Sequence, residues 1–579
     1  MLLDKHIIHH VCRDHSFKNE KLFYRFDSDE PNKGQLRPAP PNVPSTWSEY
    51  FSENSQSSIM ASGVPEGFTD FFEKNPYSEE VFLDFQNAKT LDNARPARWE
   101  DPKPAQKYHM VAIGAGAGGL VTAGGAASLG GKAAIIERGF MGGDCLNTGC
   151  VPSKALLKCA GVYQQIKNAS EFGVTIGGEV SLDFSKVMER MRRIRAEISE
   201  HDSCKRFTDE FGVDVYLGHA RFASPSSLVV NGETIEFEKC CIATGGKPKV
   251  VQIPGIDKVP FYTSENIWNL TKLPKRLVFI GAGPIGCELA QAFARFGSRV
   301  TMVSNQDQFL PREDRDAALI LEEQLVAEGV GFRKNASVER VDLLSPESED
   351  GFPLIQVVVD GERHECEAVM MAVGRTPNVE GLDLEMAGVE YTQSGITVND
   401  YLKTSNKNIY AVGDCASKYQ FTHVADAMAR IVLRNALFHG KSKFSELCIP
   451  WCTYTEPEIA HVGCYSRELK NQNYQEFVKY FKEVDRAITE GETQGFVKIL
   501  CKGKSDEILG ATIVGKNAGD MISEISVALV NKVGLGKIAK VIHPYPTLAE
   551  AIKMCADDYN RTRLTPTAKS FMRFIINST

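Results

Sequence analysis

Two glycine-rich segments constrain the fold of this 579-residue chain more than any other feature. Each lies between a short apolar run and a run suited to a helix, and they are Gly114-Ala115-Gly116-Ala117-Gly118-Gly119 and Gly281-Ala282-Gly283-Pro284-Ile285-Gly286. In a βαβ unit the first glycine permits the tight turn, the second lets a pyrophosphate approach the backbone, and the third lets helix and strand pack closely. The sequence therefore predicts two dinucleotide-binding units.

The residues around the first turn complete this pattern. We expect a strand over 108–113, a helix over 120–129 and a second strand over 133–136 that ends at Glu137. A carboxylate at this position accepts hydrogen bonds from ribose hydroxyls. Glu137 is therefore a candidate ligand of the nucleotide bound at the first turn.

The second turn has the same flanks but a different final residue. We expect strands over 277–280 and 300–303 with a helix over 287–296 between them. Ser304 and Asn305 stand where a carboxylate would bind the ribose 2′-hydroxyl of NAD, and its absence removes a repulsion against the 2′-phosphate of NADP. The sequence favours NADPH, and NADH stays open because no arginine falls at an obvious clamping position.

Cys145 and Cys150 lie between the two turns, five residues apart, next to an expected helix. This spacing brings the two sulfur atoms within the limits of a disulfide. A zinc site would need further Cys or His ligands at short spacing, and the neighbouring sequence holds none. Two nucleotide sites around one reactive pair imply electron transfer from a nicotinamide, through a flavin, to a disulfide.

Composition narrows the class of protein further. The chain is long enough for three or four domains, has a net charge of −8, and contains no block of Lys and Arg, which argues against a nucleic-acid partner. No apolar run reaches membrane length. Fifteen scattered cysteines suggest a reducing compartment, either cytoplasm or an organelle matrix, without naming which.

Residues 1–106 differ from the rest and are interpreted as a partly disordered N-terminal extension. Its prolines mark an irregular linker, and its histidines are interpreted as part of a solvated tail. Aromatic residues at near-helical spacing predict short helices that dock on the main body, and these residues are Trp47, Tyr50, Phe51, Phe68, Phe71 and Phe72. Residues 101–104 are expected to be a linker.

Six separated motifs, in order, resemble those of the class I pyridine nucleotide–disulfide oxidoreductases. Besides the glycine turns and the Cys pair they are 243–246, 410–414 and 546–550, with 374–378 as a further marker. The resemblance covers about 107–579 and implies an α/β fold with two Rossmann-like domains, an α+β dimerisation domain and a homodimer. The implied boundaries are 107–270 and 395–446 for the FAD domain, 271–394 for the NAD(P) domain and 447–579 for the dimerisation domain.

The resemblance also implies roles for individual residues. Cys150 would be the thiolate nearer the flavin, Cys145 the thiol that meets substrate, and Lys154 a charge near the flavin that pairs with Glu288 and lowers the pKa of Cys150. The implied FAD-binding residues are Gly114, Gly116, Gly119, Glu137, Thr244, Gly245 and Asp414, and the second turn contributes Gly281, Gly283 and Gly286 to nucleotide binding. Gly143 and Gly374 are further implied cofactor-binding residues.

The C-terminal segment departs from the pattern of dihydrolipoyl dehydrogenase and glutathione reductase. Tyr545 replaces the histidine that precedes Glu550 by five residues, as in mercuric reductase, and His543 lies two residues too early. No cysteine follows Cys555, so the terminal Cys pair of mercuric reductases is missing. Tyr545 and Glu550 are the catalytic candidates here.

These features predict an FAD-dependent NAD(P)H oxidoreductase of mercuric reductase-like type that passes electrons through Cys145 and Cys150 to a metal ion or a disulfide. One alternative is dihydrolipoyl dehydrogenase, with His543 or a shifted loop supplying the base. Another is a flavoprotein retained as a binding or scaffold component.

Overall fold

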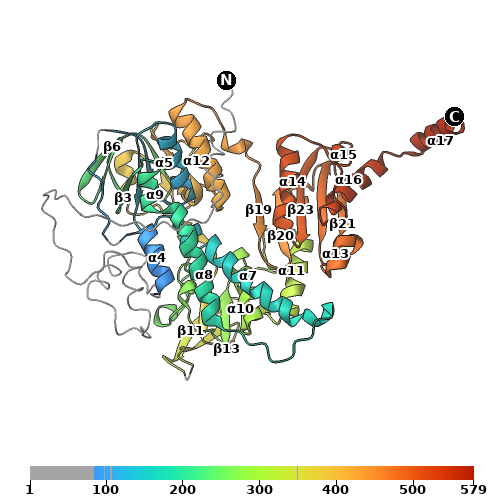
Figure 1. The fold of residues 1–579 in the computed structure, drawn as a ribbon, viewed down its shortest axis with the longest axis horizontal. Helices are drawn as coiled ribbons and strands as arrows, with labels where there is room; N and C mark the ends of the chain where they lie inside the picture. Colours follow the sequence, from blue (N-terminus) through green and yellow to red (C-terminus); the bar gives the residue numbers. More distant parts are fainter. Residues whose placement is uncertain (1–83, 97, 105–106, 349, 579) are drawn as a thin grey trace, which may run out of the picture. The chain divides into compact units, whose positions relative to one another are not determined.

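The computed structural model describes residues 84–96, 98–104, 107–348 and 350–578. The histidine-rich N-terminus and the aromatic residues between Trp47 and Phe72 lie outside these residues. Among the described helices, none combines the length and apolar character needed to cross a membrane. Three main sheets, each with its own helices, organise the chain (Figure 1).

The first sheet contains the strand that precedes the first glycine turn. Its strand order is β3-β2-β1-β6-β5-β4, and β18 pairs with β6 in parallel. The strands are β1 Tyr108–Ile113, β2 Ala133–Glu137, β3 Asp214–Leu217, β4 Arg221–Ser224, β5 Ser227–Val230, β6 Glu233–Ile242 and β18 Ile409–Ala411. Helix α5 (Ala117–Ser128) packs on β1 and β2, and α12 (Thr422–Leu437) packs on α5. The helix predicted over 120–129 begins earlier because Gly116 already has the extended conformation of a helix N-cap.

The second sheet repeats this arrangement around the second turn. Four parallel strands lie in the order β10-β9-β8-β14, and a separate antiparallel sheet has the order β11-β12-β13. The elements are β8 Arg276–Ile280, α10 Pro284–Phe296, β9 Arg299–Val303, α11 Arg315–Ala327, β10 Gly331–Arg333, β11 Val338–Ser345, β12 Leu354–Val359, β13 Glu362–Cys366 and β14 Ala368–Met371. Helix α10 starts at Pro284, a residue suited to the first helical position.

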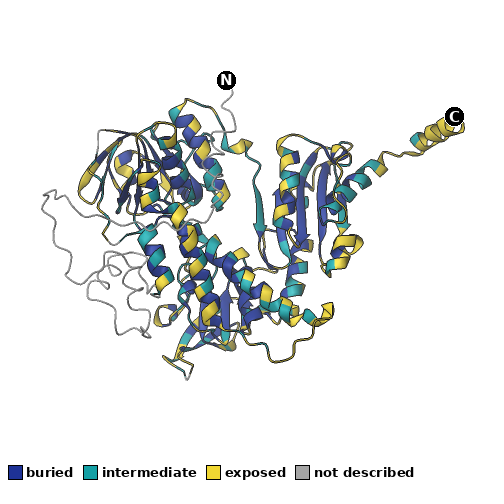
Figure 2. Cartoon of the chain, viewed as in Figure 1, coloured by how far each residue is buried: buried dark blue, intermediate teal, exposed yellow. Residues whose placement is uncertain are grey.

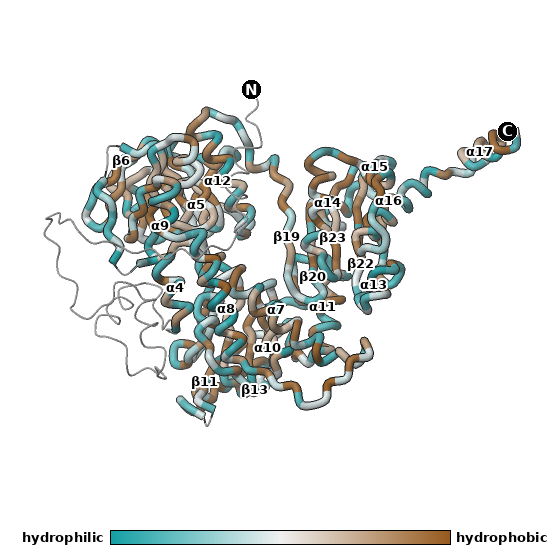
Figure 3. The backbone as a smooth tube through the Cα atoms, viewed as in Figure 1, coloured by the Kyte–Doolittle hydropathy of each residue, from teal (hydrophilic) through white to brown (hydrophobic). Residues whose placement is uncertain are grey.

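The third sheet is antiparallel, with the order β19-β20-β23-β22-β21. Its elements are β19 Pro450–Thr453, β20 Glu458–Gly463, β21 Tyr474–Tyr480, α13 Asp485–Glu490, β22 Phe496–Lys502, β23 Ile508–Gly515, α14 Ala518–Val530, α15 Leu535–Ile538 and α16 Glu550–Thr562. Helix α17 (Pro566–Ser578) has no buried residue although it carries Phe571, Phe574 and Ile576 (Figure 2 and Figure 3).

The remaining helices surround the Cys pair and the first sheet. They are α4 Phe85–Ala94, α6 Gly143–Asn147, α7 Cys150–Lys167, α8 Phe184–Ser199 and α9 Cys204–Asp209. Two short strand pairs, β7 (Gly246–Pro248) with β15 (Arg375–Pro377) and β16 (Tyr391–Thr392) with β17 (Gly395–Ile396), complete the described α-helices and strands, and short 3-10 turns lie between them.

A buried ion cluster joins the second and third sheets. Lys498 on β22 is 3% exposed, and its ammonium contacts Asp314 at 3.0 Å and Asp316 at 2.8 Å at the start of α11. Both carboxylates raise the pKa of Lys498 against the opposing effect of burial. Because a buried charge is stable only with its partners, this cluster fixes α11 against the sheet.

We expect Lys498→Ala to lower the free energy of unfolding by about 3 kcal/mol, because it leaves the buried carboxylate of Asp314 with only the exposed Arg467, at 3.2 Å, as a cationic partner. Thermal and urea unfolding measure the change. Lys502→Ala is the matched control, since Lys502 lies on the same strand and pairs with Glu507 while 60% exposed. Its loss is expected to cost less than about 1 kcal/mol. Equal effects of the two variants would contradict a structural role for the buried cluster.

Candidate active site

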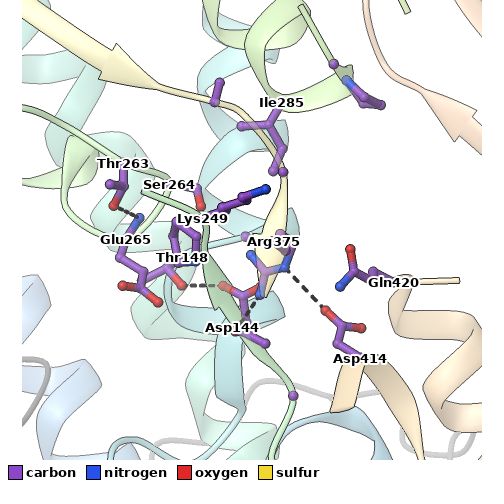
Figure 4. Close-up of a pocket in the computed structure, with 18 of the residues that line it drawn as sticks. Asp144, Thr148, Lys249, Thr263, Ser264, Glu265, Ile285, Arg375, Asp414 and Gln420 are labelled. Carbon is purple, nitrogen blue, oxygen red and sulfur yellow. Dashed lines mark hydrogen bonds and ion pairs between the residues drawn. The ribbon is translucent and has the colours of Figure 1, made fainter. Parts of the chain in front are cut away.

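A single cavity of about 2940 Å³ adjoins both glycine turns and the Cys pair. Its lining includes Gly116, Cys145, Cys150, Gly283 and Asp414. Figure 4 shows part of this cavity, where the side chains of Asp144, Arg375 and Asp414 face one another. The structure therefore brings most of the predicted site residues to one place.

The first turn is closed by backbone contacts that only glycine allows. Gly114 has φ +100°, and a Cβ there would lie 2.4 Å from the carbonyl oxygen of Ala243. A Cβ on Gly119 would lie 1.7 Å from the carbonyl oxygen of Gly114. Gly143 lies against Gly116, where a Cβ would be 2.5 Å from the neighbouring Cα. This last contact joins the turn to the helix that carries Cys145.

Glu137 ends β2 inside the same cavity. Its carboxylate accepts hydrogen bonds from the backbone N–H groups of Ala115 and Gly139, both at 2.6 Å. Burial raises the pKa of Glu137, and the two hydrogen bonds oppose that effect. The carboxylate thus braces the turn as well as facing the cavity.

The Cys pair bridges α6 and α7. Both cysteines are free thiols, and Cys150 is the first residue of the long helix α7. A hydrogen bond from Cys145 lowers the pKa of Cys150 to about 6, with further help from the Thr422 hydroxyl at 3.4 Å and from the charge of Lys154. The same bond and burial raise the pKa of Cys145. A thiolate therefore resides on Cys150 at neutral pH, and Cys145 donates to it.

Lys154 contacts one residue from the unit of the second sheet and one from the segment that follows β19 in the third sheet. Its ammonium donates to Glu288 of α10 at 2.9 Å and lies 4.4 Å from the centre of the Tyr454 ring. The second oxygen of Glu288 accepts the backbone N–H of Tyr454 at 2.9 Å. The expected pairing of Lys154 with Glu288 is present, and Tyr454, which sequence reasoning missed, completes it.

Arg375 links the Cys segment to the predicted flavin-binding loop (Figure 4). Its guanidinium contacts Asp144 at 2.7 Å and Asp414 at 3.3 Å, and it donates to the carbonyl of Gly246 at 2.7 Å. Burial raises the pKa of Asp414. Sequence reasoning did not assign Arg375 or Asp144, although each adjoins an assigned residue, Gly374 and Cys145.

Hydrogen bonds join Thr244 and Gly245 to Asn378 at the edge of the cavity. Thr244 donates its hydroxyl to the carbonyl of Asn378 at 2.6 Å, and the Asn378 N–H donates to the carbonyl of Gly245 at 2.9 Å. Gly374 has φ +111°, a conformation that side chains disfavour, and it lines the cavity. These residues shape the wall between the two predicted nucleotide sites.

The second turn presents an open face to the cavity. A Cβ on Gly281 would lie 2.3 Å from the carbonyl oxygen of Ala372, and one on Gly286 would lie 2.9 Å from that of Gly281. A Cβ on Gly283 would meet nothing within 4 Å, and no side chain caps α10. Ser304, 6% exposed, accepts the backbone N–H of Gln306 at 3.1 Å.

Tyr545 and Glu550 lie away from the cavity within one chain. Tyr545 is 69% exposed and donates its hydroxyl to Asp485 at 2.7 Å, while Glu550 is the first residue of α16. His543 contacts Glu524 at 3.0 Å and the carbonyl of Val541 at 3.3 Å, so both of its ring nitrogens have partners. The structure does not bring these residues to the Cys pair of the same chain.

The cavity suits two dinucleotides. The N-termini of α5 and α10 carry no side-chain caps, so their N–H groups stay available to phosphates, and a Cβ on Gly283 would meet nothing within 4 Å. FAD would be held by the first turn, Glu137 and Asp414, and a nicotinamide nucleotide by the second turn. Bound FAD supplies two-electron transfer between nicotinamide and thiols.

Comparison with known proteins agrees with this geometry. The family model for pyridine nucleotide-disulphide oxidoreductases matches residues 108–429, and the model for their dimerisation domain matches 449–556. A mercuric reductase of Lysinibacillus sphaericus is 34% identical to this chain over 460 residues. The match covers 78% of this chain and 83% of that enzyme. A dihydrolipoyl dehydrogenase of Bacillus subtilis is 34% identical to this chain over 465 residues. The match covers 77% of this chain and 97% of that enzyme.

A solved structure is also similar. The HOCl-induced flavoprotein disulfide reductase RclA of Escherichia coli has a TM-score of 0.70 and 29% identity, covering 78% of this chain and 99% of that one. The same protein as a Cu(II) complex has a TM-score of 0.69 and 28% identity over the same shares.

The chain belongs to the pyridine nucleotide-disulphide oxidoreductase family. It is an NAD(P)H-dependent flavin disulfide oxidoreductase, since that is the activity of the family, which uses FAD and NAD(P)H. The predicted family and fold class are confirmed, and the dimerisation domain supports a homodimer. The comparisons include mercuric reductases and dihydrolipoyl dehydrogenases at similar identity, so they leave the specific member open.

We expect Lys154→Met to raise the pKa of the Cys150 thiol by about one unit, because it removes a nearby positive charge. The pH dependence of iodoacetamide labelling of the reduced protein, mapped to Cys150 by mass spectrometry, measures this pKa. Lys158→Met on the next turn of α7 serves as the control because Lys158 is exposed and unconnected to Glu288. The same midpoint in wild type and Lys154→Met would contradict the electrostatic account.

Proposed function

We propose that the enzyme passes electrons from NADPH through Cys145 and Cys150 to a soft metal ion, as a mercuric reductase-like enzyme does. The observation that carries this proposal is the Cys150 thiolate, with a pKa near 6, hydrogen-bonded to a protonated Cys145 that lines the same cavity. Thiolates are the preferred ligands of soft metals.

Electrons and protons balance with these two residues. NADPH supplies two electrons and one proton, which convert the Cys145–Cys150 disulfide to the Cys145 thiol and the Cys150 thiolate. A divalent ion such as Hg(II) then takes up two electrons and becomes the metal, while the disulfide reforms and the proton of Cys145 leaves. Lys154 keeps Cys150 ionised, and Cys145 meets the acceptor.

The exposed position of Tyr545 supports a role across the dimer. Its hydroxyl already donates to Asp485, so its oxygen remains able to accept a hydrogen bond or contact a metal. In a homodimer of this family the segment would reach the Cys pair of the second subunit. The Cu(II) complex of RclA supports a metal ion as the substrate class.

Dihydrolipoyl dehydrogenase is the second candidate, since relatives with that name match equally well. It needs a base that deprotonates the substrate thiol. His543 fits this role poorly, because its side chain is only 6% exposed and both ring nitrogens have partners. Rapid NAD⁺ reduction by dihydrolipoamide that disappears in His543→Ala would favour this candidate over metal reduction.

We expect the wild-type enzyme to oxidise NADPH in the presence of Hg(II) and excess small thiol, and Cys145→Ser to lose this activity by about a thousandfold, because the group that meets the acceptor is gone. NADPH absorbance follows turnover. Cys555→Ser is the control, since Cys555 is buried in α16. Absence of Hg(II)-dependent turnover in a wild-type enzyme whose flavin NADPH still reduces would exclude this acceptor.

Nucleotide preference has its own test at Ser304. We expect Ser304→Glu to raise the ratio of kcat/KM for NADH to that for NADPH by about tenfold or more, because the new carboxylate repels the 2′-phosphate and accepts from the 2′-hydroxyl. Asn305→Gln, a neutral change at the adjacent residue, is expected to leave the ratio unchanged. A wild-type enzyme that already prefers NADH would refute the predicted preference.

A further inference from the structure

The start of helix α17 is specified by its own sequence. Pro566, a residue suited to the first helical position, begins the helix. The Thr565 hydroxyl accepts the backbone N–H of Ala568 at 3.2 Å, and the Thr565 carbonyl accepts the N–H of Lys569 at 2.9 Å. These contacts lie within residues 565–569, so the helix begins without help from the rest of the fold.

The apolar residues of α17 fall on one face of the helix. Their spacing follows the helical period, and they are Ala568, Phe571, Met572 and Ile575, with Phe574 and Ile576 at the edges. Ser570 and Asn577 lie on the opposite face, and Lys569 and Arg573 lie between the two faces. The helix is therefore amphipathic, with its cations beside the apolar face.

This apolar face is open to solvent in the described structure. Phe571 is 64% exposed, Met572 49% and Phe574 69%, and the helix has no buried residue (Figure 2). A helix of 13 residues is marginal in water, and in proteins such helices are stabilised mostly by packing an apolar face. Clustered apolar side chains at a surface mark interaction sites. We therefore looked for the partner that this face fits.

The charge around α17 is opposite in sign to that of the whole chain. Residues 559–579 contain Arg561, Arg563, Lys569 and Arg573 and no Asp or Glu, whereas the chain has a net charge of −8. Arg561 pairs with Asp558 at 2.6 Å. The other three cations are exposed and form no ion pair within the described residues. The partner of this segment is therefore expected to be negatively charged.

The dimer contact that the family shares does not include this helix. The dimerisation-domain model ends at residue 556, before α17 begins at Pro566. The matched domain has its own exposed apolar side chains, among them Val527, Val530 and Ile542. A second copy can therefore pack on that domain without using α17.

A lipid surface fits both the apolar face and the charge. At about 20 Å the helix is too short to cross the roughly 30 Å of hydrocarbon in a bilayer, so it would lie along the surface. Amphipathic helices with Phe or Leu on one face and Lys or Arg beside it bury the apolar face at the headgroup boundary. Their cations then contact anionic headgroups.

We propose that α17 binds the surface of an anionic lipid bilayer, with Phe571, Met572 and Phe574 entering the headgroup boundary and Lys569 and Arg573 contacting anionic headgroups. The helix would hold the reductase at a membrane surface although none of its described helices can cross one. This inference goes beyond the proposed function and is independent of the electron acceptor.

Co-sedimentation of the full-length protein with vesicles tests this assignment. The vesicles contain phosphatidylcholine and phosphatidylserine at about 7:3, or phosphatidylcholine alone. We expect the protein to bind the anionic vesicles, and binding to be at least about tenfold weaker on the neutral vesicles and at high ionic strength. A wild-type protein that does not bind the anionic vesicles would overturn the proposal.

Two neighbouring substitutions separate the apolar contact from the charge. Phe571→Glu and Ser570→Glu change the charge of the same helix by the same amount, but only Phe571 belongs to the apolar face. We expect Ser570→Glu to weaken binding to anionic vesicles about fivefold and Phe571→Glu at least about fiftyfold. Equal weakening by the two variants would show that the apolar face does not enter the bilayer, and would contradict the proposal.

Sedimentation velocity of the same proteins tests the rival partner, a second copy of the chain. A Phe571→Glu protein that becomes monomeric, together with a wild type that ignores vesicles, would assign the apolar face to that copy instead. Thermal unfolding and FAD content are expected to match in wild type and both variants, because α17 has no buried residue. If Phe571→Glu does not fold, Phe574→Glu against Asn577→Glu repeats the comparison with the same expected difference.

Discussion

The rest of the site depends on the contact between the backbones of Gly116 and Gly143. Any side chain at Gly143 would enter the space of the first dinucleotide turn, since a Cβ there would lie 2.5 Å from the Cα of Gly116. This approach fixes α6 and the start of α7, and with them the Cys pair, relative to the place where the cofactor phosphates bind. The distance between the cofactor and the thiols is therefore set by contacts between main-chain atoms. Such contacts do not depend on side-chain rotamers.

The charge of Lys154 lowers the pKa of Cys150, and the residues that hold Lys154 in place come from the other units of the fold. Its carboxylate partner Glu288 comes from the second dinucleotide unit, and Tyr454 comes from the segment that follows β19. The residues that keep Cys150 ionised are thus distributed over the whole described fold. Movement of any one unit would alter the local field at the thiolate, so assembly of the domains and activation of the nucleophile are a single structural event.

Sequence alone predicted what lies within short motifs. The glycine turns, the strands of β1 and β8 and the Cys spacing follow from local pattern, and the structure places them as expected apart from earlier helix starts. The ion pairs of Arg375 with Asp144 and Asp414, and the contact of Asn87 with Arg195, join residues 39 to 231 positions apart, and no local period encodes such pairs. Tyr545 was found by comparison with a motif, yet its partner Asp485 could come only from the fold.

The position of α4 has a consequence for how long the enzyme keeps its cofactor. Short peripheral helices open locally far more often than the domain unfolds. Because Asn87, Thr90 and Leu91 of α4 line the cavity together with Glu137 and Gly116, we expect exchange of bound for free flavin to follow the opening rate of this helix. Cleavage of the chain between α4 and β1 would then shorten the residence time of FAD while leaving the turnover of loaded molecules unchanged.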